Sequence, residues 1–219
     1  MPAEFSLNLL KEKFMKQKKL KVGVTGSIGS GKSTFSKFIT ERGFSVINLD
    51  DISKELLAAD MQIKEKIIQE FGKESYIGDA LNKKYLAEKV FSNHEQIAKI
   101  NSIVHPAVIK KTEFLLKENL EKNNLVFAEA ALIYEADMEN LFDYVILVTS
   151  DEKLRLERKV LFENYSEEQF LKRNENQIPD EEKKKRADFV VENSGTLAEL
   201  KLKCGFILNI LQGLLLTND

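Results

Sequence analysis

A glycine-rich loop between an apolar segment and a helical pattern constrains the fold more than any other feature. Residues 26–33 read Gly-Ser-Ile-Gly-Ser-Gly-Lys-Ser and fit the pattern G-x-x-x-x-G-K-[ST]. The apolar segment 20–24 precedes the loop, and Phe35, Phe38 and Ile39 recur at helical spacing after it. A strand, a loop of this kind and a helix, in that order, predict an α/β domain that binds a nucleoside triphosphate.

Each fixed position of this loop has a physical role in holding a polyphosphate. The glycines let the loop take positive φ, so that backbone N–H groups converge on anionic oxygens. The ammonium of Lys32 is a mobile charge for the β- and γ-phosphates, and the hydroxyl of Ser33 is a ligand for Mg²⁺. The predicted nucleotide-binding residues are Gly26, Gly29, Ser30, Gly31, Lys32, Ser33 and Thr34.

Composition narrows the class of protein. The 219 residues suit one domain with an inserted subdomain, and 33 basic against 35 acidic residues disfavour a nucleic-acid-binding surface. Cys204 is the single cysteine and lies in an apolar stripe, which predicts a buried thiol and a reducing compartment. We find no apolar run as long as a membrane span and no signal-peptide pattern. We therefore expect a cytoplasmic protein with no membrane partner, and a monomer by default.

Five short apolar runs, separated by helical patterns, predict a five-stranded parallel sheet covered by helices on both faces. Pro106 is expected to kink or restart the last helix of an inserted helical region in which no strand is expected. The predicted strands are 20–24, 44–50, 125–130, 144–149 and 189–193. The predicted parts are an extension (1–19), a core (20–52, 125–150 and 188–219), a helical acceptor-binding region (53–124) and a lid (151–187).

Acidic residues end two of the predicted strands. Ligands of open α/β sheets bind at the carboxyl ends of the strands, so Asp50 and Glu129 are expected beside the phosphate loop. We expect Asp50 to accept or orient the proton of an acceptor hydroxyl, with helix capping as the alternative. We expect Glu129 to contact Mg²⁺ or its waters, with an ordinary surface acid as the alternative.

The loop alone does not distinguish kinases from other nucleotide-binding proteins. The guanine-reading pattern N-K-x-D is missing, because Asn82-Lys83 has no aspartate in register, and this disfavours a GTPase. The segment 151–187 is densely charged, which is typical of a solvated helix surface. Its place after a strand favours a lid that brings cations to a transferred phosphoryl group.

The later motifs together resemble the dephospho-CoA kinase family, from about residue 20 to the last helix. They are 43–50, Ile103-Val104-His105-Pro106, 132–135, the pair Arg173 and Gln177, and 181–195. The resemblance implies ATP-dependent phosphorylation of the ribose 3′-hydroxyl of dephospho-CoA, the last step of coenzyme A synthesis. It implies ATP and Mg²⁺ as cofactors. It also implies a kinase built of three parts, namely a core, CoA-binding helices and a lid.

The resemblance also implies roles for single residues. These are a catalytic carboxylate at Asp50, ATP contacts from the lid residues Arg158 and Arg173 beside Lys32 of the loop, and acceptor contacts at Lys54, Lys83 and His105. For His105 a structural hydrogen bond is the alternative.

The chain departs from the family pattern at several positions. Asn48 stands where the family commonly has Asp, and Lys54 and Lys83 stand where it commonly has Arg. Phe162 stands at the position of a second lid Arg, and residues 130–133 do not contain the family's Pro-Leu-Leu. Lysine lacks the bidentate fork of arginine, so we expect weaker or rearranged acceptor contacts. The alternatives are another P-loop nucleoside or small-metabolite kinase and a non-catalytic ATP-binding module.

Overall fold

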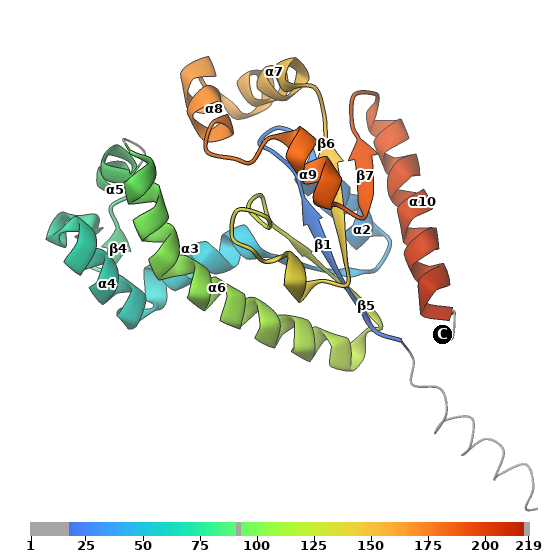
Figure 1. Ribbon diagram of the computed structural model, residues 1–219, viewed down its shortest axis with the longest axis horizontal. Helices are drawn as coiled ribbons and strands as arrows, with labels where there is room; N and C mark the ends of the chain where they lie inside the picture. The colour runs from blue at the N-terminus through green and yellow to red at the C-terminus, as the bar shows by residue number, and fades with distance from the viewer. Residues whose placement is uncertain (1–17, 91–92, 217–219) are drawn as a thin grey trace, which may run out of the picture.

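The computed structural model describes residues 18–90 and 93–216 (Figure 1). Its centre is a five-stranded sheet in the order β2-β5-β1-β6-β7, in which all neighbouring strands are parallel. The strands are β1 (Leu20–Thr25), β2 (Ser45–Asn48), β5 (Leu125–Glu129), β6 (Tyr144–Thr149) and β7 (Phe189–Glu192). The predicted parallel sheet is confirmed. Nearly all of the predicted extension, 1–19, lies outside the described residues.

The sheet is buried on both faces because its strands are apolar on both. Along β5, Val126 and Ala128 belong to one apolar cluster, and Leu125 and Phe127 to the other. Helices α2 (Lys32–Glu41) and α10 (Leu197–Leu216) pack together on one face. Cys204 of α10 is buried in that cluster, as predicted.

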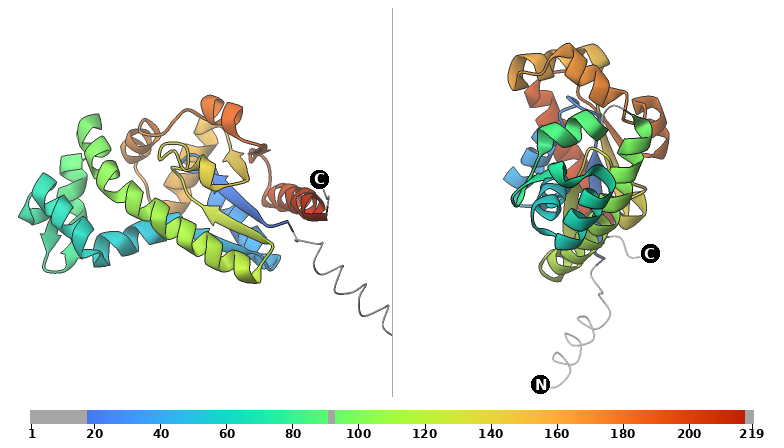
Figure 2. Two further views of the ribbon diagram at one scale, coloured as in Figure 1. Left: turned by 60° about the horizontal axis from the view of Figure 1, so that its bottom comes forward. Right: turned by 90° about the vertical axis from the view of Figure 1, so that its left-hand side faces the viewer.

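The other face carries the helical region. It contains α3 (Leu49–Ala59), α4 (Met61–Phe71), η1 (Lys73–Ser75), α5 (Lys83–Val90) and α6 (His94–Lys122). Helix α6 packs against β2 and β5, and Figure 2 shows α4 and α5, in teal and green, projecting away from the sheet. None of the helices in the two described ranges is long and apolar enough to cross a membrane.

The helical region differs from the prediction in one way. It contains a short antiparallel hairpin of β3 (Tyr76–Ile77) and β4 (Ala80–Leu81), turned at Gly78, whose φ is 62°. A two-residue Gly-Asp turn is a hairpin signal, but the strands are too short to show a period. Of the two outcomes expected at Pro106, the restart does not occur, because α6 packs against neighbours along its length and tolerates one missing hydrogen bond. The kink stays a prediction.

The second strand is shorter than predicted. It ends at Asn48, whose side chain accepts a hydrogen bond from Asp51 N at 3.1 Å and caps α3. Asp50 therefore lies in the first turn of a helix rather than at the end of a strand. Helix capping, the alternative considered for Asp50, belongs to Asn48 instead.

The charged segment folds into three helices. They are α7 (Glu152–Glu163), α8 (Glu167–Asn174) and α9 (Asp180–Arg186), and a short η2 (Glu139–Leu141) precedes β6. In Figure 1, α7 and α8 lie above the carboxyl ends of β1 and β6. The charged segment thus covers the edge of the sheet where the phosphate loop lies.

Candidate active site

The phosphate loop needs glycine at two positions where the backbone is left-handed. Gly31 has a φ of 93°, and a Cβ there would lie 2.3 Å from Asn193 Nδ2, which donates to Ser30 O at 2.8 Å. Gly29 has a φ of 78°, and its Cβ would lie 2.5 Å from Arg155 O. Side chains at either position would strain the backbone and displace neighbouring atoms.

The phosphate loop is held by hydrogen bonds with residues of α7, α9 and the loop before α9, and α8 supports α7. Ile28 N donates to Gln177 Oε1 at 2.8 Å, and the Asp180 carboxylate accepts from the hydroxyls of Ser27 and Thr149. Arg155, only 5% exposed, donates to the carbonyls of Ile28 and Ser150 and to the Asn174 side chain. Sequence reasoning missed Arg155 and Asp180, because both stand in a run that resembles solvated surface.

Glu129 meets the start of α2. Its Oε1 accepts from Ser33 Oγ at 2.6 Å and lies 3.7 Å from Lys32 Nζ, and the residue is 5% exposed. Magnesium prefers oxygen ligands, keeps several waters and uses only one or two carboxylates beside substrate phosphates. The donor set of Ser33 and Glu129 fits that ion. Among residues 18–90 and 93–216, no group of three or more His, Cys, Asp or Glu forms a separate metal site.

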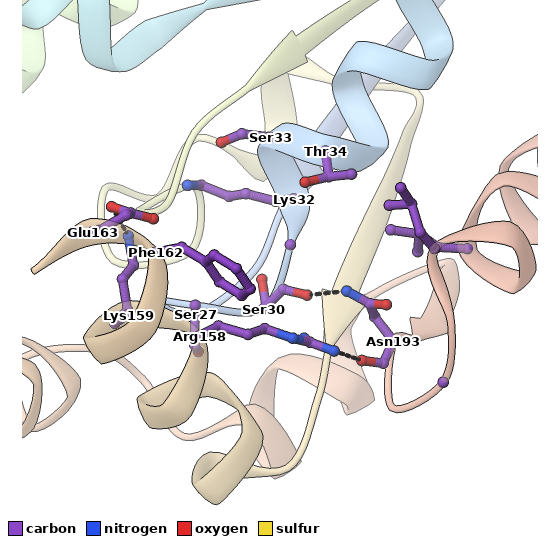
Figure 3. A pocket seen from close by; sticks show the side chains of 15 residues that line it. Ser27, Ser30, Lys32, Ser33, Thr34, Arg158, Lys159, Phe162, Glu163 and Asn193 are labelled. Atoms are coloured by element: carbon purple, nitrogen blue, oxygen red, sulfur yellow. Dashed lines mark hydrogen bonds and ion pairs between the residues drawn. The ribbon is translucent and has the colours of Figure 1, made fainter.

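A cavity of about 590 Å³ lies between the phosphate loop, α7 and the segment after β7 (Figure 3). Arg158 lines it and donates from Nη2 to Asn193 O at 2.7 Å, while its buried Nη1 has no hydrogen-bond partner within the described residues. Phe162 lines the same cavity and is 80% exposed. Of the predicted nucleotide-binding residues, this cavity is lined by Gly29, Ser30, Gly31, Lys32, Ser33 and Thr34.

Gly26 has a different role from the other loop glycines. It does not line the cavity, and a Cβ there would lie 2.2 Å from Val148 O and 2.5 Å from Ser30 Oγ. Its lack of a side chain lets the loop approach β6 closely.

A second cavity, of about 770 Å³, lies between the phosphate loop, the helical region and α8. Asp50 and Lys32 line it together with apolar side chains from α5 and α6. Its charged side chains are five cations, Lys32, Lys54, Lys83, Lys159 and Arg173, and three carboxylates, Asp50, Glu135 and Glu163. Such a cavity suits a ligand with both anionic and apolar parts.

The structure separates some residues that were predicted together. Arg173, expected at ATP, lines the second cavity, with its guanidinium over the Tyr165 ring at 5.3 Å. His105 lines neither of these two cavities and is half-buried in α6, where burial lowers its pKa against the opposing charges of Asp137 and Glu135. Its acceptor contact stays a prediction.

An ion pair with a buried cation lies at the wall of the second cavity. Glu135 Oε1 lies 2.9 Å from Lys183 Nζ and also accepts from Ile178 N at 2.9 Å. The Lys183 side chain has no exposed surface. This pair ties α9 to the loop that follows β5.

The parallel sheet, the phosphate loop and the adjoining second cavity are the arrangement typical of P-loop kinases of small molecules. Shikimate kinase from Acinetobacter baumannii shares the fold, with a TM-score of 0.55 at 15% identity, covering 92% of this chain and 97% of that one.

More specific matches identify the family. The sequence model of the family described as dephospho-CoA kinase matches residues 20–199. Dephospho-CoA kinase from Chlamydia caviae is 37% identical over 186 residues, 84% of this chain and 92% of the relative. The chain belongs to the dephospho-CoA kinase family, whose members are ATP-dependent phosphotransferases.

Two solved structures agree with that assignment. Dephospho-CoA kinase from Campylobacter jejuni has a TM-score of 0.66 at 30% identity and covers 86% of this chain and 95% of its own. The Thermus thermophilus protein TT1252 has a TM-score of 0.72 at 32% identity, over 92% of this chain and 100% of its own. The family resemblance expected from the motifs is confirmed.

Proposed function

We propose that the protein transfers the γ-phosphoryl group of ATP to the ribose 3′-hydroxyl of dephospho-CoA, giving coenzyme A and ADP. The observation that carries this proposal is that the nucleotide cavity and the second cavity share Lys32 and Ser33. A donor phosphate and an acceptor hydroxyl held in these cavities would meet at those two residues. Positioning of this kind supplies much of the catalysis in phosphoryl transfer.

The lining of the second cavity supports an acceptor of this class. Dephospho-CoA carries a pyrophosphate and a long, largely uncharged arm. Lys54, Lys83 and Arg173 would bind anionic groups, and Leu86, Val90 and Ile97 would contact the arm. A small neutral sugar or nucleoside would bring no anionic group to these cations.

In the proposed reaction the acceptor oxygen bonds to the γ-phosphorus as the bond to the β–γ bridging oxygen breaks. Asp50 would orient the hydroxyl and accept its proton, and ADP leaves with the bridging oxygen. Lys32 and Arg158 would hold the phosphates. Ser33 and Glu129 would hold Mg²⁺, which neutralises phosphate charge when bound.

Other parts of the proposal concern the protein as a whole. The segment 151–187, with α7, α8 and α9, forms a lid over the nucleotide, and the helical region 53–124 forms the acceptor-binding part. The protein acts as a monomer in the cytoplasm, without nucleic-acid or membrane partners. The near balance of charge argues against a nucleic-acid partner, and the single cysteine supports a reducing compartment.

The test is ADP release by the purified protein with Mg-ATP, with and without dephospho-CoA. Adenosine, dTMP and shikimate serve as control acceptors. We expect release that depends on dephospho-CoA, with coenzyme A as the product. Binding of ATP without any stimulation by dephospho-CoA would overturn the acceptor assignment, and stimulation by a control acceptor would favour another small-molecule kinase.

A further inference from the structure

Five residues line both the nucleotide cavity and the second cavity: Gly29, Lys32, Ser33, Lys159 and Glu163. The first three belong to the phosphate loop and the start of α2. Lys159 and Glu163 belong to α7, on the facing wall (Figure 3). A phosphoryl group that passes from one cavity to the other crosses the space between these two walls.

Lys159 is held in place by two neighbouring side chains, Glu163 and Tyr165. Its Nζ lies 2.6 Å from Glu163 Oε2, and its ammonium stands 5.1 Å from the centre of the Tyr165 ring. The side chain is only 15% exposed. A polyphosphate carries more negative charge than one carboxylate, so it competes with Glu163 for this ammonium.

The other α7 residues of the nucleotide cavity do not supply positive charge at this junction, and Glu163, which lines both cavities, is an acid. Arg158 lines the nucleotide cavity but not the second one, and its Nη2 is bonded to Asn193 O. Phe162 carries no charge and also lines only the nucleotide cavity. Of the α7 side chains that line these two cavities, Lys159 is the cation common to both.

We propose that Lys159 is a further catalytic residue, which leaves Glu163 and contacts the γ-phosphoryl oxygens during transfer. The inference rests on the proposed function. Lys159 contributes positive charge opposite Lys32, while the acceptor oxygen forms its bond to phosphorus and the bond to the bridging oxygen breaks. A positive charge held where negative charge develops in the transition state raises kcat more than it strengthens the binding of substrate.

The experiment compares Lys159→Gln, Lys159→Arg and Lys153→Gln in the full chain. Lys153 is an exposed residue of the same helix that lines neither cavity, so it controls for loss of one α7 charge. We expect Lys159→Gln to lower kcat about 100-fold while the Kd for ADP changes less than about threefold. Lys159→Arg, which keeps the charge, should retain most of kcat, and Lys153→Gln should match wild type.

The outcomes distinguish a failure of the proposed role of Lys159 from a failure of the proposed function. A wild-type protein without turnover of dephospho-CoA would defeat the proposed function first. With an active wild type, the inference fails if Lys159→Gln matches Lys153→Gln, if its kcat and ADP affinity fall together, or if Lys159→Arg is as slow as Lys159→Gln. Thermal unfolding checks each variant. If Lys159→Gln is unstable, Lys159→Met, which keeps the apolar stem beside Tyr165, takes its place in the comparison.

Discussion

The hydroxyl of Ser33 donates a hydrogen bond of 2.6 Å to the carboxylate of Glu129, which joins the start of α2 to the carboxyl end of β5. The two residues are 96 positions apart in the chain. Both are oxygen donors at the place where a nucleotide phosphate would lie. The fold thus builds the proposed magnesium site from two separate motifs.

Glu129→Gln should weaken magnesium dependence without unfolding the protein. The amide keeps an oxygen that can accept from Ser33 but loses the charge that attracts the ion. We expect a higher Mg²⁺ concentration for half-maximal turnover, measured by ADP release across a magnesium titration at fixed ATP. An unchanged magnesium profile would remove Glu129 from the site.

Asp50→Asn should lower kcat by at least about 100-fold, because loss of the base removes proton acceptance from the acceptor hydroxyl. ATP binding, measured by calorimetry, should change little, since Asp50 lines the second cavity and not the nucleotide cavity. Glu55→Gln is the matched control, an exposed acid of the same helix that lines neither cavity. Near-wild-type turnover in Asp50→Asn would contradict the role of Asp50.

Gly31→Ala should reduce both stability and nucleotide affinity. The left-handed backbone and the close Asn193 amide make a methyl group costly, by about 1–3 kcal/mol of unfolding free energy. Gly213→Ala provides the contrast, because a Cβ in that part of α10 meets no atom within 4 Å. For Gly213→Ala we expect the free energy of unfolding to rise by about 1 kcal/mol, because alanine has a higher helix propensity than glycine. Urea unfolding and ADP titration measure both effects, and equal behaviour of the two variants would refute the strain argument.

Lys183→Met should lower the free energy of unfolding by about 3–5 kcal/mol, because it leaves Glu135 buried without its cation. Adding Glu135→Gln should recover much of that loss, since the amide oxygen still accepts from Ile178 N. Lys184→Met is the control. Its partner Glu181 is exposed, so the expected change is below about 1 kcal/mol. Urea unfolding of the four proteins would refute the argument if the Lys183 and Lys184 variants were equally stable.

Burial raises the pKa of the Cys204 thiol to about 11. The folded protein therefore favours the neutral thiol, and this contribution to stability is complete below the ordinary pKa of 9.0 and is lost as the pH rises toward about 11. We expect the stability difference between wild type and Cys204→Ala to shrink from about pH 8 to about pH 10.5 in urea unfolding. A stability difference that stays constant over this pH range would contradict the raised pKa of Cys204.

Local patterns predicted much of the fold. The loop from Gly26 to Ser33, the apolar strands and the helical stripe around Cys204 all appear where the sequence places them. Errors arose where local signals were short, as in the two-residue strands β3 and β4, or where an element ended early, as at Asn48 before Asp50.

The sequence by itself determined the phosphate loop, because glycine conformations and the strand-to-helix change depend on neighbouring residues. Only the tertiary structure decided which charges of the segment 151–187 are buried or lie at the cavities. Arg155 bonds to Ile28, 127 positions away, and Lys183 is buried against Glu135. Lys159 reaches the junction only because α7 packs above the sheet edge. Burial and pairing of charges depend on contacts between distant segments, and no local pattern of residues specifies those contacts.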